Sequence, residues 1–159
     1  MAEELVKIEG SKSEIYSSLI PQIKALVGDE KDMVANQANI AAALKEAFGF
    51  LWVGFYNVRE DMMILGPFQG PIACTRIRKG KGVCGTVWET KKPILVHNVD
   101  EFDGHIACST LSKSEVVIPL IRECQVIGVL DVDSDQLAAF DENDVLYLNE
   151  ICEWFVSTL

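Results

Sequence analysis

The sequence predicts an α+β fold in which a central antiparallel sheet carries the N- and C-terminal helices on one face. Apolar residues recur at three- and four-residue steps near both ends of the 159-residue chain, as on the buried side of a helix. Short β-branched runs separated by turn residues fill the middle. Neighbouring runs are close enough to form hairpins, which favours antiparallel pairing, and no repeat or linker divides the chain.

Two helices are expected before the first strand. The first begins near Ser13, a residue that can cap a helix, and runs to about residue 27 although Pro21 lies within it. The second covers about residues 32–48, is rich in alanine and ends at Gly49, a residue typical of helix C-caps.

The middle of the chain predicts short strands separated by turns rich in glycine, proline and charge. Strands are expected at residues 50–58, 62–65, 72–77 and 94–96. Gly66-Pro67 is expected to end the second strand, and residues 82–90 to form a short helix. Residues 98–114 have no periodicity and indicate a long loop, and long loops often carry function.

A hairpin and a helix complete the predicted order. Residues 115–121 and 125–133 are rich in β-branched side chains and flank a polar turn, which is typical of two paired strands. Asp141 precedes a segment with one apolar stripe, which predicts the last helix.

The composition limits the partners. Lys and Arg number 14 against 24 Asp and Glu, and the net charge of −10 repels nucleic acids and anionic membranes. The candidate basic patch is one short stretch that more often forms a solvated turn, namely Arg76, Arg78, Lys79 and Lys81. We therefore expect neither a nucleic-acid nor a membrane partner.

The N-terminus is acidic, whereas a secretory signal is basic and then apolar. The strongly apolar run at residues 116–121 is far too short to span a bilayer. These features predict a cytoplasmic protein whose five cysteines are kept reduced.

Residues 80–85 match the glycine pattern G-x-G-x-x-G of dinucleotide-binding proteins. That motif requires a parallel β-α-β unit, whereas the strands here are expected to be linked as hairpins. We reject nucleotide binding, and two interpretations stay open: a helix N-terminus that holds a small carboxylate, or a plain glycine-rich turn.

The cysteines lack the close pairs that structural zinc sites use, so no metal is expected. Cys152 lies on a helix stripe and Cys124 in a turn, where an isolated cysteine usually acts as a small apolar residue. Cys74, Cys84 and Cys108 lie in irregular stretches. If two of them approach each other, they can serve as a nucleophile and a resolving thiol.

Acidic residues mark the hairpin. Asp131 and Asp133 alternate along one strand and so share a face with Ile127, where carboxylates can raise each other's pKa and supply a proton. A two-residue turn puts Glu115 opposite Val132, on the other face, whereas a three-residue turn brings it to the acids. Turn capping by the two aspartates is the competing interpretation.

Trp52 and Tyr56 flank Gly54 on one face of the first strand. They form either a wall for a thioether or a cation, or part of a core strand that is buried on both sides.

These pieces together resemble one family, the free methionine-R-sulfoxide reductases, which are built on a GAF domain. The matching segments are residues 70–74, 82–86, 102–108, 114–115 and 128–134. The resemblance covers essentially the whole chain and implies a single GAF domain over residues 1–159.

Carried over by position, the resemblance implies that Cys108 attacks the sulfoxide sulfur and Cys74 resolves the product as a disulfide, with Cys84 as an accessory thiol. It also implies that substrate is bound by Glu115, Asp131, Asp133, Trp52 and Tyr56. Reduction by a thioredoxin-type dithiol is expected, with no metal or organic cofactor.

Two alternatives stay open. A non-catalytic GAF domain could sense a small ligand or the redox state, or the chain could be a structural domain that forms a homodimer through its terminal helices.

Overall fold

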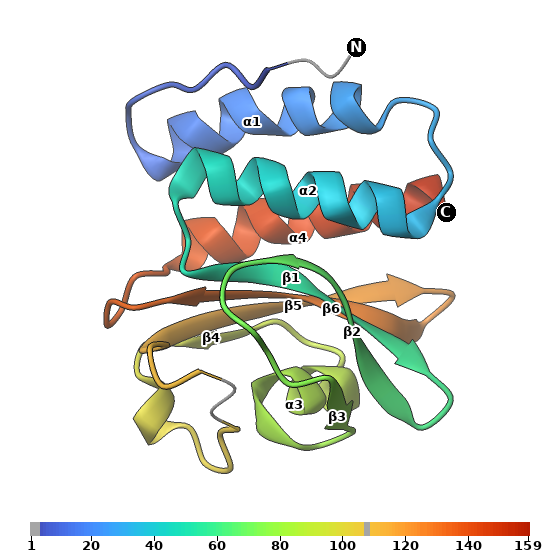
Figure 1. The fold of residues 1–159 in the computed structure, drawn as a ribbon, viewed down its shortest axis with the longest axis vertical. Coiled ribbons are helices and arrows are strands. Elements are labelled where there is room, and N and C mark those ends of the chain that lie inside the picture. The colour runs from blue at the N-terminus through green and yellow to red at the C-terminus, as the bar shows by residue number, and fades with distance from the viewer. Residues whose placement is uncertain (1–3, 107–108) are drawn as a thin grey trace.

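A computed structural model describes residues 4–106 and 109–159, and in this part of the chain the centre of the fold is a six-stranded sheet in the order β3-β2-β1-β6-β5-β4 (Figure 1). Neighbouring strands pair antiparallel. The strands are β1 (Trp52–Arg59), β2 (Met62–Gln69), β3 (Arg76–Arg78), β4 (Ile94–Val96), β5 (Ser114–Arg122) and β6 (Gln125–Ser134).

The terminal helices lie together on one face of the sheet, as the sequence predicts (Figure 1). They are α1 (Lys12–Val27), α2 (Met33–Phe48) and α4 (Glu142–Thr158). The short helix α3 (Gly82–Thr90) packs on the opposite face, and the 3-10 turn η1 (Val99–Glu101) follows β4. The α+β prediction is confirmed.

The helix ends follow local side-chain chemistry. Asp32 caps α2 and Gly49 ends it with a φ of 66°, and Asp141 caps α4, all at the predicted positions. The start of α1 differs, because Ser11 rather than Ser13 is the cap. The Ser11 hydroxyl accepts from the backbone of Glu14, whose carboxylate accepts from the backbone of Ser11, so two backbone donors are satisfied at once.

Strand β2 continues through Gly66-Pro67, where the sequence predicts a break. The pairing of β2 with β1 changes register between Gly54 and Tyr56. As a result, Gly66 and Pro67 of β2 lie at a β-bulge opposite Phe55 of β1. Proline is tolerated at such a bulge because its missing N–H breaks no regular ladder hydrogen bond. The next strand begins at Arg76 rather than at residue 72, and the segment before it forms part of the pocket.

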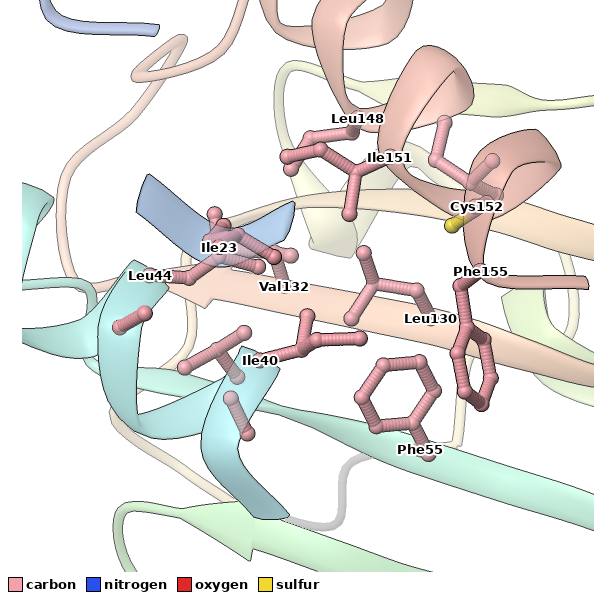
Figure 2. Packing of buried hydrophobic residues seen from close by; sticks show 14 of the residues in the cluster. Ile23, Ile40, Leu44, Phe55, Leu130, Val132, Leu148, Ile151, Cys152 and Phe155 are labelled. Atoms are coloured by element: carbon pink, nitrogen blue, oxygen red, sulfur yellow. The ribbon is translucent and has the colours of Figure 1, made fainter. Parts of the chain in front are cut away.

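One hydrophobic cluster fills the space between the sheet and helices α1, α2 and α4 (Figure 2). Phe55 and Leu130 reach it from the sheet, Ile40 from α2, and Ile151 and Phe155 from α4, and each of these side chains is fully or almost fully buried. Close packing of this kind makes the helix side a rigid support for the strands.

A second cluster lies between the sheet and α3. Its strand residues point to the opposite face of the sheet from those of the first cluster, because successive side chains of a strand alternate between faces. They include Trp52, Tyr56 and Val129, which pack with Val83 and Val87 of α3. Within the described ranges, no helix is long and apolar enough to cross a membrane.

Candidate active site

A pocket opens on the α3 face of the sheet, between α3 and residues 71–73, 105–106 and 109–112. Its floor comes from β1, β5 and β6. The residues that line it are Leu51, Trp52, Tyr56, Pro71, Ile72, Ala73, Ile77, Lys81, Gly82, Val83, Cys84, His105, Ile106, Ser109, Ser112, Glu115, Asp131 and Asp133.

The register of the β5–β6 hairpin brings the acids together by a route that sequence reasoning missed. Arg122 pairs with Gln125, so the turn has two residues, which predicts Glu115 on the wrong face. However, the register shifts by one after Leu120, and Ile127 is the extra residue of a β-bulge. As a result, Glu115 lies opposite Asp133.

Because of the bulge, the apolar residues on the acid face differ from those predicted. Asp131 and Asp133 share it with Val129 and, across the bulge, Val126, both of which belong to the α3-side cluster. Ile127, expected on the acid face, packs against the helix-side cluster instead. The expectation that a two-residue turn counts against a three-carboxylate site is therefore wrong.

Burial raises the pKa of each of the three carboxyl groups of the pocket. Burial raises the pKa of Asp131 well above its usual range, and the nearby Asp133 and Glu115 raise it further. Burial and Asp133 likewise raise the pKa of Glu115, while a hydrogen bond with Asp131 opposes the shift. Asp131 and Glu115 therefore favour their protonated forms more strongly than exposed carboxyl groups do.

Ser112 and His105, from the loop before β5, contact the carboxyl groups of Asp133 and Glu115. Burial raises the pKa of Asp133 to about 6, although the hydrogen bond from Ser112 and the charge of His105 lower it. The Ser112 hydroxyl donates to Asp133 Oδ1 at 2.5 Å, and His105 Nε2 lies 3.5 Å from Glu115 Oε2. Ser112 was not among the predicted site residues, because a serine in an aperiodic loop gives no sequence signal.

Trp52 and Tyr56 form a continuous aromatic wall. Their ring centroids lie 6.0 Å apart, and Trp52 also stacks on Phe68 at 5.2 Å. Glycine is required at position 54, since a Cβ there would lie 2.3 Å from the Cβ of Phe68. Both aromatic residues are buried, so the wall is at once part of a core and a pocket surface.

The same aromatic residues hold the segment that carries Cys74. The Trp52 indole N–H donates to the Pro71 carbonyl at 3.1 Å, and the Tyr56 hydroxyl donates to the Cys74 carbonyl at 2.9 Å. The wall and the cysteine segment are thus positioned together.

The cysteines differ in state. Cys74 is disulfide-bonded, whereas Cys84, Cys124 and Cys152 are free thiols. Burial, followed by the charges of Asp131, Glu115 and Asp133, raises the pKa of Cys84 well above its usual value, so its thiol is a poor nucleophile. Burial also raises the pKa of Cys152 in the helix-side core, as expected for a structural residue. Cys124 is exposed in its turn, so the expectation of a small buried apolar residue is wrong there. Cys108 lies outside the described residues.

The glycine-rich segment forms a tight turn before α3. Gly80 N–H donates to the Gly85 carbonyl at 2.8 Å, and a Cβ on Gly85 would lie 2.4 Å from the Arg78 carbonyl oxygen. The surrounding strands are antiparallel, so the dinucleotide-binding interpretation is excluded. Gly82 and Val83, in the first turn of α3, line the pocket, and the first backbone N–H groups of a helix have no partner within the helix.

The pocket therefore brings together six of the predicted site residues, which are Trp52, Tyr56, Cys84, Glu115, Asp131 and Asp133. Ala73, directly before Cys74, also lines it. Cys84, Glu115 and Asp131 are the described residues whose donor atoms are grouped closely enough to hold a metal ion.

An antiparallel sheet with helices on one face and a small-molecule pocket on the other defines a GAF domain. The GAF domain family model matches residues 29–154. GAF domain-containing protein A of Dictyostelium discoideum is 59% identical over 152 residues, which cover 95% of this chain and 96% of that protein.

The chain is also similar, over most of its length, to enzymes of one kind. The free methionine-R-sulfoxide reductase of Escherichia coli is 42% identical over 142 residues, covering 89% of this chain and 86% of that protein. The crystal structure of free methionine-R-sulfoxide reductase from Neisseria meningitidis, in complex with its substrate, matches with a TM-score of 0.97 and 50% identity. That match covers 99% of this chain and 95% of the other. The chain belongs to the free methionine-R-sulfoxide reductase family.

Proposed function

We propose that this protein, acting as a single GAF domain, reduces free methionine-R-sulfoxide to methionine. The observation that carries the proposal is the pocket itself, where the buried carboxyl groups of Glu115 and Asp131 and the partly buried one of Asp133 face an aromatic wall beside the segment of Cys74. The solved relative from Neisseria meningitidis, a free methionine-R-sulfoxide reductase in complex with its substrate, supports it.

The two ends of a free amino acid match opposite sides of the pocket. The ammonium group lies against the acids, where Glu115 and Asp133 are paired across the strands. The carboxylate faces the first turn of α3 beside Lys81. Trp52 and Tyr56 enclose the methyl group and sulfur. A peptide-bound methionine sulfoxide lacks the free ammonium group, and this pocket therefore selects against it.

The reaction needs a thiolate and an acid. Cys108 attacks the sulfoxide sulfur while an acid protonates the sulfoxide oxygen, because that oxygen is a poor leaving group. Asp131 is the acid we assign, since burial and the nearby carboxylates favour its protonated form. The sulfur–oxygen bond breaks, the oxygen leaves as water, and the Cys108 sulfur is joined to the methionine sulfur. Water then attacks the Cys108 sulfur, this sulfur–sulfur bond breaks, methionine leaves, and Cys108 becomes a sulfenic acid while one proton is released.

A second thiol then closes the cycle. The thiol of Cys74 condenses with the sulfenic acid to form a disulfide and release water, and an external dithiol of the thioredoxin type reduces the disulfide. The disulfide-bonded state of Cys74 favours it over Cys84, which is a buried free thiol with a raised pKa. Cys84 remains accessory. We place the reaction in the cytoplasm, where such dithiols are kept reduced.

The test is an assay of both epimers of free methionine sulfoxide with a thioredoxin system, with peptide-bound methionine sulfoxide as the control. We expect turnover of the free R epimer, and loss of turnover in Cys108→Ser. Turnover of neither epimer contradicts the proposal. Ligand binding that survives replacement of Cys74, Cys84 and Cys108, without methionine release, would instead identify a non-catalytic sensor.

A further inference from the structure

The thiol of Cys84 lies among the acids of the pocket. It comes from α3, Glu115 from β5 and Asp131 from β6, and all three residues are buried. One donor atom from each, the sulfur and two carboxylate oxygens, lies within 4.8 Å of the others. These residues are far apart in the sequence, so ligand spacing along the chain cannot reveal the group.

The size of the group fits a four-coordinate cation. Bonds of about 2.3 Å to sulfur and about 2.1 Å to oxygen place tetrahedral ligand atoms roughly 3.5 Å apart. Since the donor atoms lie within 4.8 Å of one another, the group needs to contract by at most about 1.3 Å at its widest separation. Rotation of the Glu115 side chain, which has three rotatable bonds, can supply such a movement.

One carboxylate oxygen of these three residues lacks a partner. Oδ1 of Asp131 is buried and has no hydrogen-bond partner among the described residues, in a side chain that is only 7% exposed. A buried carboxylate oxygen without a partner costs free energy, which a bound cation can recover.

We propose that Cys84, Glu115 and Asp131 bind a thiophilic divalent cation such as Zn²⁺, which occupies the pocket in competition with the amino acid substrate. A thiolate ligand selects Zn²⁺ over Mg²⁺ and Ca²⁺, which prefer oxygen. Binding displaces the protons held by the thiol and the carboxyl groups. Once these protons are displaced, three anionic ligands and one Zn²⁺ carry a net charge of only −1.

Competition follows from the positions of the ligands. The acids that bind the metal are those that face the substrate, so cation and amino acid cannot occupy the pocket together. His105, 3.5 Å from Glu115 Oε2, is placed to orient that carboxylate as an outer partner. The proposed metal site does not depend on the proposed function, whereas the proposed competition between cation and substrate rests on that function.

Co²⁺ binding to the oxidised protein tests the site directly. In this form Cys74 is disulfide-bonded, which removes its thiol as a competing ligand. We expect one equivalent of Co²⁺ to give a thiolate-to-cobalt charge-transfer band that Zn²⁺ displaces. Cys84→Ser is expected to abolish the band and weaken Zn²⁺ binding by more than about tenfold, since loss of an outer partner alone costs roughly 10- to 100-fold.

Cys124→Ser is the matched control, because Cys124 is a free thiol exposed in the β5–β6 turn. It should leave the band unchanged. Glu115→Gln keeps the thiol and should weaken Zn²⁺ binding, and thermal unfolding verifies that each variant is folded. Absence of the band in the wild type, or its persistence in folded Cys84→Ser, overturns the metal site. If free methionine sulfoxide does not weaken Zn²⁺ binding, the competition is refuted and the metal site stands.

Discussion

Replacing Asp133 with asparagine is expected to stabilise the protein at neutral pH and leave its stability unchanged in acid. Burial raises the pKa of Asp133 from 3.8 to about 6, so the folded protein holds this proton more tightly than the unfolded chain does. The stabilisation from this proton is complete below about pH 4 and is lost as the pH rises through about 6. Asparagine stays neutral, so the variant avoids the loss.

The magnitude follows from the same two pKa values. At about 1.4 kcal/mol for each pKa unit, the difference between 3.8 and about 6 corresponds to about 3 kcal/mol. Asp133 is only partly buried and solvent screens part of its charge, so we expect the free energy of unfolding to rise by about 1–3 kcal/mol near pH 8. The gain should disappear near pH 4.

Urea unfolding of wild type and variant, followed by tryptophan fluorescence across this pH range, measures the effect. Asp135→Asn is the control, because it removes the same charge from an exposed position two residues away and should show no such pH-dependent gain. A difference between Asp133→Asn and wild type that is independent of pH, or a loss of stability near pH 8, refutes the reasoning. The stabilised variant should also lose roughly 10- to 100-fold in kcat/KM, since a charged hydrogen-bond partner of the substrate is removed.

Three further predictions address the wall, the cysteine segment and the core. Gly54→Ala places a Cβ 2.3 Å from the Phe68 Cβ and should cost about 1–3 kcal/mol in urea unfolding and raise KM; unchanged values would contradict a tight wall. Tyr56→Phe removes the hydrogen bond to the Cys74 carbonyl and should cost about 1 kcal/mol, with faster amide exchange at residues 70–74 as the specific readout. Leu130→Ala empties part of the helix-side core and should cost about 2–5 kcal/mol while kcat/KM of the folded enzyme stays within about twofold, so a larger kinetic effect would show that this core shapes the site.

Much of the fold could be predicted because its signals are local. Asp32, Gly49 and Asp141 act on the backbone next to them, and the apolar periodicity of each helix reports the face it buries. The exceptions are cases where another strand decides. Gly66-Pro67 is typical of a strand end, yet β2 accommodates it at a bulge opposite Phe55. A bulge depends on how two strands pair, so the sequence of one strand alone does not reveal it.

The site shows the same division. Alternation along single strands placed Trp52 beside Tyr56 and Asp131 beside Asp133 correctly. The position of Glu115 relative to Asp133 depends on how two strands align, and the approach of Cys84 to both strands depends on the packing of α3. Neither can be calculated from spacing, because each is fixed by tertiary contacts.

The bulge at Ile127 decides which way a distant part of β6 faces. If the strands paired regularly from the turn onward with Ile127 retained, the inward and outward sense of β6 would be reversed from Gly128 to its end. Leu130 would then enter the pocket and Asp131 the hydrocarbon interior, some 13 Å from Ile127 at about 3.3 Å per position. Removal of Ile127 would instead give a regular hairpin that keeps Glu115 opposite Asp133, so functional relatives should lose this residue and the bulge together.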